Sequence, residues 1–224
     1  MVSPMPEMPE SFTNSEESLF EAGIARTVVF EGKLLRVLRD VVRLPDNSSA
    51  TREYISHPGA VMIIPILDDG QIVLERQFRY PVGRVLIEFP AGKLDAGEPS
   101  LSCAMRELKE ETGYIAREWA FGGVIHPVIS YSTEHIDVWF ARGLIPGRAS
   151  LDAGEFLDVH TVLPDELFGW CLAGQVSDAK TLAGAFLLQN VLNGCKQLDW
   201  APANAAGLPV PDGPYVPPLM TDKP

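Results

Sequence analysis

The chain has 224 residues, a net charge of −12 and 46% hydrophobic residues. This acidic balance argues against general nucleic-acid binding, which needs a basic surface, and no apolar run approaches the length of a membrane span. The three cysteines show neither disulfide nor metal-ligand spacing, and the N-terminus lacks an apolar signal-peptide core. These features favour a reducing compartment and predict a cytoplasmic protein.

Most of the predicted elements are strands. After a polar arm with three prolines, residues 26–44 alternate well enough for two strands around the Glu31-Gly32 turn, and residues 51–56 indicate a third. Residues 61–67 and 71–77 form the clearest hairpin, across an Asp-Asp-Gly turn. Further strands are expected at 85–89, 119–125, 136–141 and 156–162.

Helices are expected in the middle and near the end of the chain. The first begins near Pro99 and ends at Gly113, the second starts at Pro164, and the third, at about 179–193, should be largely buried because it is apolar on most sides. This order predicts an α+β fold, an α/β/α sandwich around a mixed sheet, with an N-terminal antiparallel β-sheet extension.

Three glutamates share one face of the first predicted helix. Glu107, Glu110 and Glu111 are spaced i, i+3 and i+4. Clustered carboxylates repel one another, and a hard cation such as Mg²⁺ among their oxygens makes the cluster favourable. The alternative is an ordinary solvated face, with Arg106 and Glu110 as a simple i, i+4 pair.

The spacing of the whole stretch from Gly92 to Tyr114 favours the metal site. Five residues separate Gly92 from Glu98, seven separate Glu98 from Arg106-Glu107, and the pattern continues through Glu110-Glu111 to Gly113. The stretch resembles the Nudix box at every fixed position. The resemblance implies a Nudix fold and a phosphoanhydride hydrolase whose cofactor is Mg²⁺, for which Mn²⁺ can substitute.

The resemblance also implies roles for individual residues. The metal ligands would be Glu107, Glu110, Glu111 and the main-chain oxygen of Ala91. Catalysis would depend on Glu107 and Glu111 through that metal. The structural positions of the box would be Gly92, Glu98, Arg106 and Gly113. Among these, Arg106 would brace the glutamate side chains and Glu98 would anchor the loop to the helix.

Residues before the box resemble one branch of the family. Gln77-Phe78-Arg79-Tyr80 and the segment at 88–93 are similar to the ADP-ribose pyrophosphatases, which split ADP-ribose into AMP and ribose 5-phosphate. This resemblance implies that Arg79 contacts the substrate, whose phosphate groups suit a guanidinium fork. It also implies that Arg52 and Glu53 reach the nucleotide, often from the partner subunit of a swapped dimer. The alternative for Arg79 is a surface arginine at the end of a strand. The alternative for Arg52 and Glu53 is an exposed strand of alternating charge.

The loop at 126–135 carries two further candidates. By resemblance, Glu134 acts as general base or as an extra metal ligand, although a lone loop glutamate usually faces solvent. Tyr131 could stack on a base or sugar, or simply fill the loop. Many relatives carry Ser-Pro-Gly shortly before the loop glutamate, whereas this chain has Ile129-Ser130-Tyr131 there. The loop over the terminal sugar should therefore have a different shape.

We accordingly divide the chain into four parts. These are a flexible arm at 1–19, a β-strand subdomain for dimerisation and substrate contact at 20–58, a Nudix core at 59–197 and an irregular tail at 198–224. We expect a homodimer through the N-terminal strands, since unpaired strand edges seek partners. The rival functions are hydrolysis of GDP-mannose, a dinucleoside polyphosphate or NADH, and a non-catalytic ADP-ribose sensor, which usually has a DNA-binding domain and lacks box glutamates.

Overall fold

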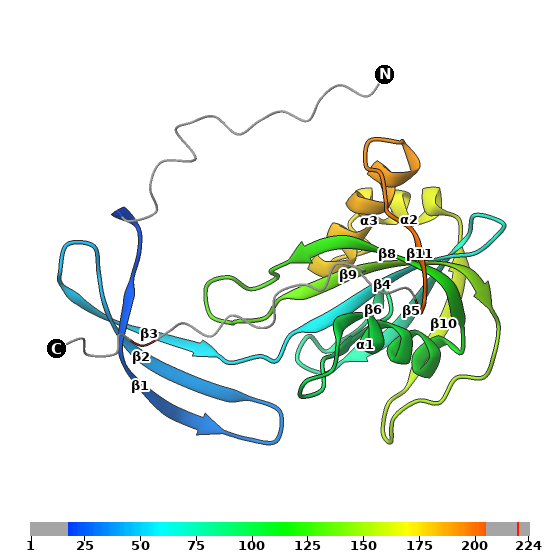
Figure 1. The fold of residues 1–224 in the computed structure, drawn as a ribbon. Coiled ribbons are helices and arrows are strands. Elements are labelled where there is room, and N and C mark those ends of the chain that lie inside the picture. The colour runs from blue at the N-terminus through cyan, green and yellow to red at the C-terminus, as the bar shows by residue number, and fades with distance from the viewer. Residues whose placement is uncertain (1–17, 205–218, 220–224) are drawn as a thin grey trace. The chain divides into compact units, whose positions relative to one another are not determined.

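The computed structural model describes residues 18–204 and residue 219. These residues form two compact units (Figure 1). The first unit contains residues 18–57, 128–134 and 219, and the second contains residues 58–127 and 135–204. Most of the arm predicted at 1–19 and of the tail predicted at 198–224 lies outside the described residues. No helix among the described residues is long and apolar enough to cross a bilayer.

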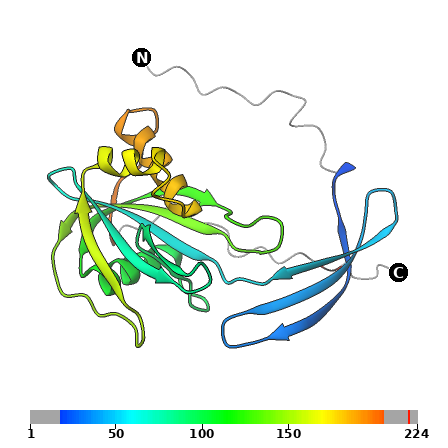
Figure 2. The same cartoon turned by 180° about the vertical axis from the view of Figure 1, so that it is seen from behind.

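The first unit is built on a three-stranded antiparallel sheet, seen from behind in Figure 2. Its strands are β1 (Ala22–Glu31), β2 (Arg36–Arg43) and β3 (Ser49–Ile55), in the order β1-β2-β3. The segment 128–134 joins this unit through two hydrogen bonds with Ile55, whose N–H donates to Tyr131 (2.9 Å) and whose carbonyl accepts from Thr133 (3.0 Å). The predicted N-terminal extension is therefore confirmed as a separate antiparallel sheet.

The buried side of this small sheet holds an ion pair as well as apolar side chains. Leu38, Asp40 and Val42 alternate along β2 and are all buried. Arg26 donates to both carboxylate oxygens of Asp40 at 2.7–3.2 Å, and the Tyr54 hydroxyl donates to the same group at 2.9 Å. The hydrogen bonds from Arg26 outweigh desolvation and lower the pKa of Asp40. The carboxylate therefore stays charged in the interior.

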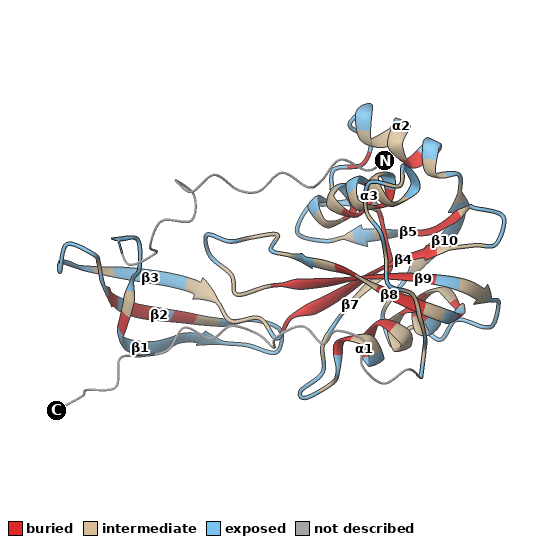
Figure 3. Cartoon of the chain, turned by 45° about the horizontal axis from the view of Figure 1, so that its top comes forward, coloured by how far each residue is buried: buried red, intermediate tan, exposed pale blue. Residues whose placement is uncertain are grey.

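The second unit contains a mixed sheet of eight strands. Its path runs β10-β5-β4-β9-β8-β11, with β6 added to β5 and β7 added to β4, and β4 and β9 are parallel neighbours. The strand bounds are β4 (Ala60–Ile66), β5 (Ile72–Arg79), β6 (Arg84–Glu88), β7 (Ala91–Lys93), β8 (Ile115–Ile125), β9 (Ile136–Ile145), β10 (Leu157–Val162) and β11 (Ala201–Pro202). Figure 3 shows the buried stretches of β4 and β9 at the centre of this sheet.

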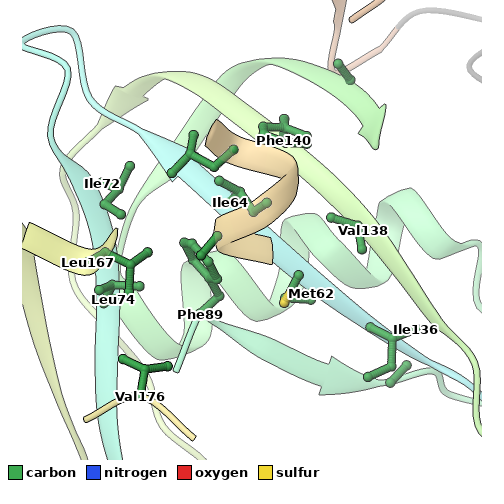
Figure 4. Close-up of a cluster of buried hydrophobic side chains, with 14 residues drawn as sticks. Met62, Ile64, Ile72, Leu74, Phe89, Ile136, Val138, Phe140, Leu167 and Val176 are labelled. Atoms are coloured by element: carbon green, nitrogen blue, oxygen red, sulfur yellow. The ribbon is translucent and has the colours of Figure 1, made fainter. Parts of the chain in front are cut away.

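Helices cover both faces of the large sheet, as the sandwich prediction requires. On one face, α1 (Ser100–Glu107) packs Cys103 and Ala104 against Val61 and Ile63 of β4. On the other face, α2 (Pro164–Leu172) and α3 (Ala179–Leu192) cover a cluster of aliphatic and aromatic side chains, drawn in Figure 4. This cluster contains Met62, Ile64, Ile72, Leu74, Phe89, Phe140, Leu167 and Leu188. The α+β fold is confirmed.

Two helix expectations need correction. The first predicted helix is α-helical only to Glu107; a π-helical turn, η3 (Leu108–Thr112), follows and ends at Gly113, whose φ of 78° is left-handed. Such turns often occur at functional sites. The third helix, α3, is not largely buried, because Phe186 remains 66% exposed while Ala185 and Leu188 face the core. Apolar composition alone did not reveal which face is covered.

Candidate active site

The loop after β6 and the turn η3 bring the box residues together. Pro90 accepts a hydrogen bond from the main-chain N–H of Ile63 (2.8 Å), which fixes the loop to β4. The N–H of Ala91 donates to Oε2 of Glu111 (3.1 Å). A β-carbon at Gly92 would collide with the carboxylate of Glu107. Only glycine at this position leaves room for the Glu107 carboxylate to lie against the loop.

Arg106 binds three glutamates at once. Its Nε and Nη2 donate to the two oxygens of Glu98 at 3.0 and 2.9 Å, and its Nη1 donates to Glu107 (2.8 Å) and Glu110 (3.0 Å). Glu98 also accepts from the N–H of Asp95 (3.1 Å). The hydrogen bonds from Arg106 lower the pKa of Glu98 to about 2. The bracing role of Arg106 and the anchoring role of Glu98 remain predictions, with which these hydrogen bonds are consistent.

A second ion cluster is centred on Glu88, at the end of β6. This side chain is 1% exposed and accepts from Nε and Nη2 of Arg79 at 2.6 and 2.7 Å. Lys180, near the start of α3, also donates to Glu88 and reaches Asp178 at 3.0 Å. Burial opposes the charge of Glu88, but Arg79 and Lys180 outweigh it and lower its pKa. The predicted phosphate-contacting arginine is thus held in a fork by a buried carboxylate.

Two more carboxylates are buried with no hydrogen bond from a cation among the described residues, and the charges of Lys180 and Arg79 only partly offset the burial of Glu75. Glu75 in β5 is 0% exposed and Glu111 is 4% exposed. Burial, followed by the charge of Glu88, raises the pKa of Glu75. Burial, followed by the charge of Glu75, raises the pKa of Glu111. These two acids repel each other and favour a shared positive charge.

Glu155 adds a further acid to this group. It lies in the segment between β9 and β10 and accepts a hydrogen bond from the side-chain amide of Gln77 (3.0 Å). Its charge contributes to the raised pKa values of Glu75, Glu107 and Glu111. Sequence reasoning missed Glu155, as it missed Glu75, Glu88 and Lys180. The one signal available in the sequence was the position of Glu75 within the apolar run of β5, since a charged residue there needs a partner or a ligand.

The remaining predicted residues lie in the first unit. On β3, Arg52 is bonded to Glu21 (Nε to Oε2, 2.8 Å), and Glu53 accepts from Nε of Arg39 (2.8 Å). In the segment 128–134, Tyr131 is exposed, and Glu134 lies 3.9 Å from Nε2 of His57. The box residues and Arg79 belong to the second unit. The roles of Arg52, Glu53, Tyr131 and Glu134 therefore remain predictions.

The donor set suits a hard divalent cation, although it is not assembled as a ready cluster. Within the described residues, no three side chains of His, Cys, Asp or Glu are arranged to hold a metal ion. Glu107 and Glu110 instead receive hydrogen bonds from Arg106. However, both oxygens of the buried Glu75 lack a hydrogen-bond partner among the same residues. Carboxylate oxygens are the ligands that Mg²⁺ prefers, so the residues fit such an ion.

Comparison with known proteins decides the family. The sequence model of the NUDIX domain matches residues 56–184, more than half of the chain. The chain belongs to the Nudix family. Among its Nudix relatives, the ADP-ribose pyrophosphatase of Bacillus subtilis is 35% identical over 77% of this chain and 95% of its own length. The ADP-ribose pyrophosphatase of Mycobacterium tuberculosis is 33% identical over 78% of this chain and 86% of its own length.

A solved structure supports the same Nudix fold. The crystal structure of an ADP compounds hydrolase superposes with a TM-score of 0.70 and 24% sequence identity, covering 78% of this chain and 95% of that chain. The coverage indicates that nearly the whole of that protein has a counterpart here.

Proposed function

We propose that this chain hydrolyses the pyrophosphate bond of a nucleoside diphosphate sugar in a Mg²⁺-dependent reaction, with ADP-ribose giving AMP and ribose 5-phosphate. The observation that carries the proposal is the contact of Glu107 with Gly92 and of Glu111 with the N–H of Ala91. These contacts gather box carboxylates at one loop. The names of the two bacterial relatives, which align over most of the chain, support the choice of ADP-ribose.

Each side chain contributes a separate task in this proposal. The groups that would hold the ion are Glu107, Glu110, Glu111 and the carbonyl of Ala91. A bound Mg²⁺ would supply shielding of the phosphate charge, activation of water and stabilisation of the leaving phosphate. Arg106 positions Glu107 and Glu110 through its hydrogen bonds. Arg79 presents its guanidinium to phosphate while Glu88 fixes its orientation. Arg52, Glu53 and Tyr131 contact the nucleotide or the sugar.

Two residues compete for the role of orienting or deprotonating the attacking water. Glu134 is the residue predicted from sequence. Glu155 is the second candidate, favoured by its hydrogen bond to Gln77 and by its effect on the pKa values of Glu107 and Glu111. The variants Glu134→Gln and Glu155→Gln separate them, because loss of the general base costs about 10²–10⁴-fold in rate. The variant that retains near-normal kcat identifies the residue without this role.

The central test of the function is Glu111→Gln, assayed by AMP release from ADP-ribose at saturating Mg²⁺. We expect kcat to fall by orders of magnitude, since the variant removes charge that holds the metal. The melting temperature of the variant should not fall, because Glu111 is buried and the charges of neighbouring acids repel its carboxylate. Near-normal turnover would contradict the assignment. Glu118→Gln, at a partly exposed acid paired with Arg142, is the matched control.

A substrate panel addresses the rival functions. ADP-ribose is compared with GDP-mannose, a dinucleoside polyphosphate and NADH by phosphate and nucleotide detection. The highest kcat/KM identifies the substrate class. Tight binding of ADP-ribose without turnover of any compound would instead support the sensor function.

A cytoplasmic homodimer completes the proposal. β1 is an edge strand that exposes apolar side chains, including Val28, Val29 and Phe30. Among the described residues, its outer edge is bridged at Gly23 by Leu219, and an otherwise open edge with exposed apolar side chains favours association. The three cysteines are free, which is compatible with a reducing compartment. Light scattering measures the mass directly, and a monomeric mass at micromolar concentration would contradict the dimer.

A further inference from the structure

Glu75 is a buried acid to which the proposed reaction assigns no task. It lies in β5, its side chain is inaccessible to solvent, and neither Oε1 nor Oε2 has a hydrogen-bond partner among the described residues. Buried charges are normally paired or bound to a metal, because an isolated buried carboxylate is costly. A buried carboxylate without a hydrogen-bond partner is therefore a candidate for binding a cation.

The strand geometry directs Glu75 away from the apolar cluster of α2 and α3. Side chains alternate along a strand, and Ile72 and Leu74 of β5 belong to that cluster. Glu75 therefore lies on the opposite face, together with Gln77, which binds Glu155. Glu88 is its direct cross-strand neighbour in β6. Glu75 thus lies on the face of the sheet that carries the acids described above.

The neighbouring cations make their hydrogen bonds elsewhere. Arg79 donates two hydrogen bonds to Glu88, and Lys180 donates to Glu88 and Asp178. Glu111, whose pKa Glu75 raises more than any other charge does, is itself buried. Glu75 and Glu111 are therefore two buried acids whose charges interact. The nearby Lys180 and Arg79 act on Glu75 through their charge without a hydrogen bond to it.

We propose that Glu75 is an additional ligand, directly or through one water, of the divalent cation that the box glutamates bind. This inference rests on the proposed metal-dependent function. It extends the site from the box helix and its loop to β5, so that the ion is bound from the sheet as well. In a competing arrangement, Glu75 and Glu111 share a proton. The carboxamide of Glu75→Gln could donate a similar hydrogen bond to Glu111 and would largely reproduce that arrangement.

The test measures metal binding rather than turnover. Mn²⁺ is titrated into the full-length wild type, Glu75→Gln, Glu75→Leu and the control Glu118→Gln, and free Mn²⁺ is counted by electron paramagnetic resonance. We expect both Glu75 variants to bind Mn²⁺ at least about 10-fold more weakly, the size of effect seen when a supporting group of a metal site is removed. The control should bind as the wild type does.

The outcomes separate this inference from the function on which it rests. Wild-type affinity in Glu75→Gln and Glu75→Leu, with clear binding by the wild type, overturns the role of Glu75 alone. An absence of Mn²⁺ binding by the wild type overturns the metal-dependent function as well. Without metal, Glu75→Leu should have a melting temperature no lower than that of the wild type, because the substitution removes a buried carboxylate that the charge of Glu88 repels. Should the leucine variant fail to fold, the nearly isosteric glutamine variant decides.

Discussion

Replacing Gly92 with alanine tests the geometry of the box loop most directly. A β-carbon at this position would lie 2.5 Å from Cγ of Glu107 and closer still to its carboxylate, whereas ordinary contact begins at 3.4 Å. The carboxylate of Glu107 is the nearest group, so it must shift by more than about 1 Å, and a misplacement of about 1 Å can already cost about 100-fold in rate. We expect kcat for ADP-ribose to fall at least about 100-fold in Gly92→Ala.

The same substitution should leave stability nearly unchanged. The φ angle of Gly92 is not positive, so alanine meets no backbone strain, and its smaller unfolded-state entropy contributes about 0.4–1 kcal/mol of stability. Urea unfolding and steady-state kinetics are measured on the same preparation. The matched control is Gly169→Ala in α2, where a β-carbon would meet nothing within 4 Å. Wild-type kcat and Mn²⁺ affinity in Gly92→Ala would refute the placement of Glu107.

Three further predictions follow from the charged clusters. Because burial raises the pKa values of Glu75 and Glu111, the folded chain binds more protons than the unfolded chain. Thermal stability without metal should therefore fall as the pH rises from about 5 through the raised pKa values of Glu75, about 8, and Glu111, about 10, and the rise in Tm on adding Mg²⁺ should grow over that range. Asp40→Asn should lower the free energy of unfolding by about 3 kcal/mol at neutral pH in urea melts. Since Arg26 lowers the pKa of Asp40, this loss should shrink as the pH falls through that lowered value. Arg106→Lys should raise the Mg²⁺ concentration needed for half-maximal activity by about 10–100-fold, because a lysine cannot hold three glutamates; an unchanged requirement would count against the bracing role.

The fold was accessible from the sequence wherever a local pattern determines an element. Sequence patterns predicted the longer strands of both sheets, and the turn residues predicted where β4 and β5 are joined. The fixed spacing from Gly92 to Gly113 predicted the family. The short strand β7 and the π-helical turn η3 were missed, because their hydrogen bonds depend on neighbouring parts of the fold.

The site was less accessible because several of its side-chain hydrogen bonds join positions that are distant in sequence. Lys180 and Glu88 are 92 residues apart, and Glu155 and Gln77 are 78 apart. No periodicity in the sequence relates such positions. Arg106 and Glu98, only eight residues apart within the box, were predicted together. Sequence patterns thus identified the site residues that are close together in the chain. The structure was needed to find those that only folding brings together.

Glu75 and Glu88 show how neighbouring acids of one type acquire different tasks. They are opposite each other on β5 and β6, and both are fully buried. Arg79 and Lys180 bind Glu88, which stays charged and holds Arg79 in place. Glu75 has no hydrogen bond to any cation among the described residues, and burial raises its pKa. The difference lies in their partners and not in their burial. If a protein cation had bonded to Glu75, its carboxylate would be paired and could not attract Mg²⁺. Leaving Glu75 unpaired costs stability but preserves affinity for a bound ion, the trade expected where binding and stability compete.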